Sequence, residues 1–166
     1  MTSSHTLQPE LESCRVGLGR ALAHVPEVSC CAFTDACDGP AFAESTGPSD
    51  HEWLTARIAF LGPFDGMVEV TLSESTARDL CAAMLGATDA FDVAESAGLD
   101  FAGEFANMVC GSWLTEMFGQ AAFDLAPPMT ERWVSPNVEG DLYLRINDAP
   151  VRARLRLVGA MSGGQI

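Results

Sequence analysis

Three polar side chains and a glycine are spaced so that a helix would carry them on one face. Asp100, Glu104, Asn107 and Gly111 stand at positions i, i+4, i+7 and i+11 of the segment DFAGEFANMVCG. Residues with this spacing fall within one narrow stripe of a helix. An Asn amide both donates and accepts hydrogen bonds, which is what the fixing of a water molecule requires. The sequence therefore predicts a polar stripe that is free to face a partner.

A long helix has to position this stripe. Phe101, Phe105, Met108 and Val109 lie roughly a third of a turn away from it, so they form a core face of period 3.6. The spacing predicts a helix over residues 94–119, the most apolar long helical segment of the chain. A Glu and an Asn three residues apart are a weak signal alone, and a solvated helix face is the alternative interpretation.

The segments before this helix have the polarity pattern of two strands, followed by the pattern of a helix. Residues 53–61 and 67–72 alternate in polarity around the glycine-bearing turn at 62–66, which predicts a hairpin. Ser73 followed by an acidic turn predicts the start of a helix, and Gly86 predicts its end. An acidic linker over residues 87–92 would join this helix to the long one.

The N-terminal part of the chain is predicted to form one helix and one strand. Residues 7–24 carry apolar side chains at helical spacing, and Pro26 is expected to stop that helix. Residues 28–34 are branched and aromatic, which predicts a strand. The segment 35–50 is rich in Gly, Pro, Ser and Asp, which predicts a loop with room for a short edge strand around Phe42.

After the long helix the chain returns to strands. Residues 122–129 predict a short strand broken by Pro127 and Pro128, and residues 142–146 and 151–158 predict a second hairpin. The last strand would place three arginines on one face, either as a solvated sheet face or as a docking surface. These are Arg152, Arg154 and Arg156.

The predicted elements favour an α+β fold in which helices pack on a largely antiparallel sheet. Hairpins and helices are segregated along the chain, and strands do not alternate regularly with helices. With 166 residues and 48% hydrophobic content, the chain is expected to form a single domain over residues 1–166. No internal repeat or interdomain linker is evident.

The charge and the cysteines narrow the classes of partner. A formal charge of −14, with nine Arg and no Lys, repels nucleic acid and anionic membranes, so neither is an expected partner.

Six cysteines without a Cys-x-x-Cys pair predict free thiols, and three scattered histidines predict no metal site. No basic and apolar leader and no long apolar run is present, so we expect a cytoplasmic protein.

Three segments together resemble the CheX-like and CheC-like chemotaxis phosphatases of the CheC/CheX/FliY family. They are the hairpin IAFLGPFDGMVEVTLS, the helix ARDLCAAMLG and the segment DFAGEFANMVCG. The resemblance is best over residues 53–129. It implies a CheC-like fold and a phosphatase that hydrolyses the phosphoaspartate of a CheY-type response regulator. The family site is a Glu-x-x-Asn preceded four residues earlier by Asp or Ser, which here corresponds to Glu104, Asn107 and Asp100.

The resemblance also implies roles for these residues. Asn107 would orient the attacking water, Glu104 would dock on the active-site Lys of the regulator, and Asp100 would support them. The phosphoaspartate already has Mg²⁺ and a Lys beside it in the regulator, so no cofactor is expected in this chain. The family further implies a homodimer, formed through a sheet edge or a hairpin surface.

Two details refine the resemblance. The family pattern has a proline slightly more than twenty residues after the Asn, and here Pro127 and Pro128 follow Asn107 after nineteen and twenty intervening residues. CheC-like members carry a second Glu-x-x-Asn on the earlier helix, whereas residues 74–85 contain no Asn, which favours the CheX-like branch. Two alternatives remain: a non-catalytic module that binds a response regulator, and an assembly module such as a flagellar switch component.

Overall fold

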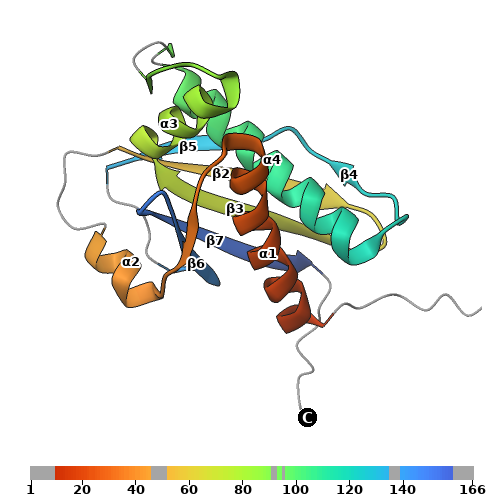
Figure 1. Ribbon diagram of the computed structural model, residues 1–166. Coiled ribbons are helices and arrows are strands. Elements are labelled where there is room, and N and C mark those ends of the chain that lie inside the picture. The colour runs from red at the N-terminus through yellow and green to blue at the C-terminus, as the bar shows by residue number, and fades with distance from the viewer. Residues whose placement is uncertain (1–9, 46–51, 91–92, 95, 135–138, 159–166) are drawn as a thin grey trace, which may run out of the picture.

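The computed structural model describes residues 10–45, 52–90, 93–94, 96–134 and 139–158. These residues form four helices and seven strands (Figure 1). In chain order the elements are α1 (Leu11–Cys30), β1 (Thr34–Ala36), α2 (Gly39–Ser45), β2 (Trp53–Leu61), β3 (Asp65–Ser73), α3 (Glu74–Leu85), α4 (Ala97–Phe118), β4 (Asp124–Leu125), β5 (Met129–Trp133), β6 (Leu142–Ile146) and β7 (Ala149–Val158).

All seven strands belong to one antiparallel sheet, which confirms the predicted α+β fold. The strand order is β1-β6-β7-β3-β2-β4, and β5 pairs β2 beside β4. The predicted hairpin is confirmed, because β2 and β3 pair along almost their whole length, with Leu54 opposite Leu72 and Ile58 opposite Val68. This hairpin is the part of the sheet on which α4 packs.

Helices α1, α3 and α4 cover one face of the sheet (Figure 1). α4 packs on β2 and β3, α3 packs on β3, and α1 packs on α4 and on β6 and β7. The long helix is confirmed, with Phe105, Val109 and Trp113 fully buried. The predicted α3 is also confirmed at both ends. Ser73 Oγ accepts a hydrogen bond from the Thr76 amide at 3.1 Å, and the chain leaves the helix through the left-handed Gly86.

The expected stop of the first helix at Pro26 is wrong. α1 continues to Cys30, with Pro26 inside it, and Leu22, Val25 and Pro26 are buried. A proline in a helix costs about 3 kcal/mol because it removes one donor and crowds the preceding turn. Burial of this side of α1 against the other helices outweighs that cost. Residues 7–9 of the predicted helix lie outside the described residues.

Because α1 is longer than expected, the strand predicted over residues 28–34 is wrong except at Thr34, where β1 begins. The predicted edge strand around Phe42 is also wrong, because Phe42 lies in α2. Asp38 Oδ1 accepts a hydrogen bond from the Ala41 amide at 2.8 Å, and a proline stands in the first turn. Residues 46–51 of the predicted loop lie outside the described residues.

Helix α2 packs on the opposite face of the sheet from the other helices (Figure 1). The fully buried ring of Phe42 meets the ring of Trp53 at a centroid distance of 5.8 Å and that of Tyr143 at 5.5 Å. This aromatic cluster joins β2 to β6 beneath the sheet. It explains why a segment with the composition of a loop forms a short helix.

The strand predicted over residues 122–129 is divided in two by Pro127 and Pro128. β4 pairs with the end of β2 and β5 pairs with its beginning, and the extension of β5 from Met129 to Trp133 was not predicted. Between them the Ala126 amide still donates to the Ala59 carbonyl at 2.9 Å. A proline lacks the donor that a ladder needs, so the break falls at the two prolines.

The second predicted hairpin is confirmed as β6 and β7. Asn147 and Asp148 have φ of 48° and 67°, which are the positive angles of a type I′ turn. β6 lies between β1 and β7, and β7 lies between β6 and β3. The C-terminal strands therefore lie inside the strand order, and the two ends of the sheet are β1 and the pair β4 and β5.

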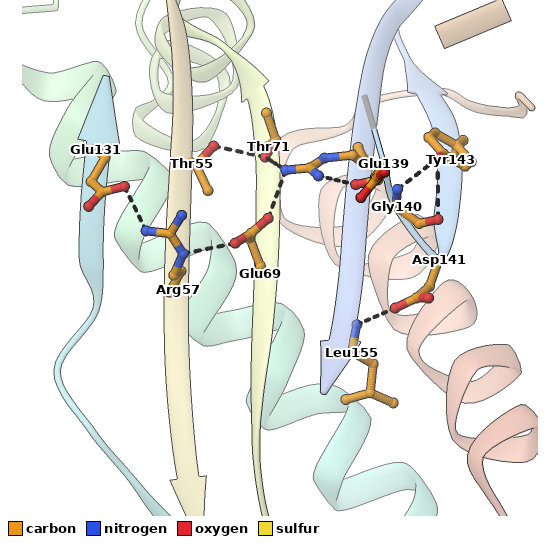
Figure 2. A network of polar contacts seen from close by, with 11 residues as sticks. Thr55, Arg57, Glu69, Thr71, Glu131, Glu139, Gly140, Asp141, Tyr143 and Leu155 are labelled. Carbon is orange, nitrogen blue, oxygen red and sulfur yellow. Dashed lines mark hydrogen bonds and ion pairs between the residues drawn. The ribbon is translucent and has the colours of Figure 1, made fainter. Parts of the chain in front are cut away.

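The face of the sheet opposite α4 carries a row of charges that crosses four strands (Figure 2). Arg152 on β7 binds Glu69 on β3 at 2.7 Å, Glu69 binds Arg57 on β2 at 2.8 Å, and Arg57 binds Glu131 on β5 at 2.7 Å. Arg152 also donates to the Glu139 carbonyl and is only 2% exposed. The expectation of a solvated arginine face is therefore wrong for Arg152, whereas Arg156 is exposed.

Burial and neighbouring charges set the protonation of several groups. Burial lowers the pKa of Arg152, and the charge of Glu69 opposes this shift. The six cysteines are free thiols, as predicted, and burial raises the pKa of Cys110 to about 12. Within the described ranges, no helix has the length and apolar character needed to cross a membrane.

Candidate functional site

Helix α4 presents the predicted stripe at the surface. Asp100 and Glu104 are exposed, and Asn107 and Gly111 are partly buried. The opposite side of the helix holds it in place, with Phe101 4% exposed and Phe105 fully buried. Glu104 and Asn107 occupy adjacent turns of this anchored helix, so their separation is fixed by helix geometry.

The polar groups of the stripe have no partners in the described part of the chain. No hydrogen bond or ion pair there involves the side chain of Asp100, Glu104 or Asn107. Elsewhere on the same helix, Glu116 is engaged by Arg20 at 2.9 Å. The three side chains are therefore available to a group that comes from outside the chain.

The connection between β4 and β5 lies along one flank of the stripe. A Cβ on Gly103 would come within 3.1 Å of two atoms of Pro128 and within 3.2 Å of Thr130 Oγ1. With a larger residue at position 103, the connection would have to move by a few tenths of an ångström to relieve this contact. Sequence reasoning noted Pro128 by its distance along the chain but missed its contact beside Glu104, which the adjacent Gly103 could have indicated.

A second group missed from the sequence lies near the start of α4. Arg132 on β5 binds Glu52 at 2.6 Å and Glu74 at 3.2 Å. Glu74 also lies against Gly98, where a Cβ would be 3.4 Å from its Cγ. A hydrogen bond from Glu74 and the Arg132 guanidinium lower the pKa of Glu52, whereas burial raises the pKa of Glu74. These contacts link β5, β2 and α3 beside the first turns of α4.

The side chains of this surface are suited to position a partner's cation and a water molecule. The described residues hold no group of three or more His, Cys, Asp or Glu side chains arranged to bind a metal ion. An exposed carboxylate pairs with a cation of a partner, and a half-buried amide holds a water through one donated and one accepted hydrogen bond. The stripe therefore suits the completion of a reaction centre that a partner carries.

Comparison with solved structures shows the fold. Chemotaxis protein CheX from Vibrio vulnificus is 16% identical, with a TM-score of 0.62 over 95% of this chain and 99% of that chain. The CheX-CheY-BeF3-Mg complex from Borrelia burgdorferi matches at 12% identity and a TM-score of 0.55, over 86% of this chain and 96% of that chain. FliY from Thermotoga maritima matches at 16% identity and a TM-score of 0.50, over 87% and 84% of the two chains.

Comparison of sequences shows the family. No curated protein matches the chain. The family described as chemotaxis phosphatase CheX matches residues 54–139, which is just over half of the chain. The matched part runs from β2 to the residues before β6 and contains the whole of α4 with its stripe, together with Pro128 on its flank. By this match the chain belongs to the chemotaxis phosphatase CheX family.

Proposed function

We propose that the protein hydrolyses the phosphoaspartate of a CheY-type response regulator and uses the stripe on α4 to do so. The observation that carries this proposal is the pair Glu104 and Asn107, which lie on adjacent turns of one helix within the part of the chain that matches the family. Neither side chain has a hydrogen bond or ion pair among the described residues. One of the structures similar in fold is described as a CheX-CheY complex with BeF3 and Mg²⁺.

Asn107 supplies the missing part of the reaction centre. The regulator contributes the phosphoaspartate, its Mg²⁺ and a Lys that neutralises the phosphoryl oxygens, so the slow step lacks only a water held in line with phosphorus. The Asn107 amide accepts one hydrogen bond from that water and donates another. Partial burial of Asn107 restricts its rotamers, so less entropy is lost when the water is fixed.

Glu104 docks the helix on the regulator. Its exposed carboxylate pairs with the active-site Lys of the regulator, and Asp100, one turn earlier, adds negative potential on the same face. The net charge of −14 favours the approach of a basic surface at low ionic strength. Glu104 has no need to act as a base, because the phosphoryl transition state calls mainly for positioning and charge neutralisation.

The test is a turnover assay with several candidate regulators from the same cell. Each regulator is phosphorylated with a small-molecule phosphodonor, the donor is removed, and phosphate loss is followed with and without catalytic amounts of the purified protein. We expect one regulator to lose phosphate faster with repeated turnover. Tight binding to a phosphorylated regulator without acceleration would contradict catalysis and support the non-catalytic binding module.

We also propose a cytoplasmic homodimer, with the free edge at β4 and β5 as the contact. Met129 is 66% exposed and Trp133 is 43% exposed on this edge, and an unpaired strand edge is a template for pairing. Light scattering should give twice the chain mass of 17.6 kDa at micromolar concentration. A mass of one chain under those conditions would contradict the dimer.

A further inference from the structure

The described part of α4 contains three glycines inside the helix, and packing within the chain explains two of them. A Cβ on Gly98 would come within 3.0 Å of Arg78 Cγ, and one on Gly103 would crowd Pro128. A Cβ on Gly111 would meet nothing within 4 Å. A glycine weakens a helix interior relative to alanine, so Gly111 lowers helix stability without any packing gain inside the described chain.

Gly111 borders a hollow in the surface. The hollow has a volume of about 160 Å³ and lies between the second half of α4 and the segment that leads into β4. Leu114, Phe123 and Leu125 supply apolar lining, and Thr115 and Gly119 also line the hollow. A cavity on the order of 150 Å³ accommodates a benzene-sized group, so this hollow has room for one apolar side chain.

The hollow is continuous with the stripe. Gly111 stands four residues after Asn107, which is about 6 Å along the helix axis. Side chains on a helix lean toward its N-terminus, so any side chain at position 111 would extend over the turn that carries Asn107. The bare glycine therefore leaves both the Asn107 amide and the hollow open to the same approaching surface.

The charges on the surface limit what can occupy it. The end of the stripe near Glu104 and Asp100 is acidic, and the hollow at the other end is lined by uncharged residues, with Thr115 beside the apolar side chains. Glu104 and Gly111 are seven residues apart, so the two ends are separated by about 10 Å. An occupant that fits both has a basic group and an apolar side chain about 10 Å apart on one face.

We propose that Gly111 and this hollow form a second contact for the phosphorylated response regulator, which inserts an apolar side chain there while its active-site Lys meets Glu104. This inference rests on the proposed function and extends it to specificity. Regulators of the same cell share the Lys and the phosphoaspartate. The side chain that enters the hollow distinguishes the regulator that this protein accepts.

The test covers the approach to Asn107 and the hollow without replacing Glu104 or Asn107. Gly111→Ala adds a methyl group in open space, and Gly111→Leu extends a side chain from the rim of the hollow over the turn that carries Asn107. Ala83→Leu, at an exposed position of α3, is the matched control for an added leucine. Binding of the beryllofluoride-activated regulator is measured by calorimetry, and dephosphorylation is measured as kcat and KM separately.

We expect Gly111→Leu to bind the activated regulator at least tenfold more weakly and to raise KM by a similar factor, with a thermal melting point no lower than that of the unsubstituted protein. Ala83→Leu should bind as the unsubstituted protein does. Leu125→Thr removes one apolar wall of the hollow and introduces a β-branched residue, which strands favour, into β4, and it should weaken binding severalfold. This second variant decides the outcome if Gly111→Leu does not fold.

The outcomes separate this inference from the function on which it rests. Unchanged binding by Gly111→Leu and Leu125→Thr, beside a protein that still dephosphorylates its regulator, would overturn the contact and leave the function standing. If the unsubstituted protein binds no activated regulator, both proposals fall. A loss of binding in Ala83→Leu equal to that in Gly111→Leu would also overturn the inference, because the effect would then be unrelated to the hollow.

Discussion

Two side chains of the stripe differ in exposure, and this difference separates their proposed roles. Glu104 is exposed, whereas Asn107 is partly buried. A long exposed carboxylate suits a contact made on binding, and a restricted amide suits the orientation of a water. Substitutions at the two positions should therefore affect different kinetic constants.

Glu104→Ala should weaken binding of the activated regulator, because it removes one partner of a charge pair that becomes desolvated in the complex. A loss of binding free energy on the order of 2 kcal/mol raises Kd roughly 30-fold. Calorimetric titration with beryllofluoride-activated regulator measures it. Glu116→Ala is the control, since Glu116 lies on the same helix but binds Arg20. Equal affinities of Glu104→Ala and the unsubstituted protein would contradict the docking role.

At the element scale, local signals predicted the parts of the fold that short-range chemistry determines. The β2–β3 hairpin, the caps of α3 at Ser73 and Gly86, and the stripe on α4 all follow from patterns within a few residues. The effect of Pro26 could not be predicted from its neighbours, because the burial of α1 against helices distant in sequence decides that position. The contact of Pro128 with Gly103 was also missed, because it depends on the pairing of β5 with β2, which is set by tertiary packing.

The approach of β5 to α4 depends on Gly103. Gly103→Ala and Gly111→Ala gain the same helix propensity, about 0.5–1 kcal/mol, so their difference isolates the contact with Pro128 and Thr130. Overpacking costs about 1–3 kcal/mol, and only Gly103 is crowded. Urea unfolding should therefore place Gly103→Ala below Gly111→Ala by roughly that amount. Equal free energies of unfolding would show that β5 moves aside without cost.

On the scale of the whole molecule, the charge row in Figure 2 joins the C-terminal strand to the edge strand that flanks the site. Arg152 is buried on β7, and Glu131 is half exposed on β5 beside the segment that contacts Gly103. Each carboxylate and guanidinium in the row is balanced by a neighbour. Loss of a buried member of the row therefore lowers the free energy of unfolding more than loss of an exposed member does.

Glu69→Gln should destabilise the fold strongly, because it leaves the charge of Arg152 in a site that is 2% exposed. Breaking a buried pair by removing one partner costs about 3–5 kcal/mol. Glu131→Gln is the matched substitution at the exposed end of the row and should cost about 0–1 kcal/mol, since Arg57 keeps Glu69. Urea denaturation gives both values. Similar losses in the two variants would contradict the burial argument.

The saturated dephosphorylation rate of Asn107→Ala tests the central claim most directly. The regulator is phosphorylated and each protein is titrated until the rate no longer rises, with thermal melting as the folding control. In the proposed mechanism Asn107 orients the water and does not hold the regulator, so the saturated rate should fall by about 10- to 1000-fold, and binding of the beryllofluoride-activated regulator should change little. An unchanged saturated rate in a folded Asn107→Ala protein would contradict the mechanism.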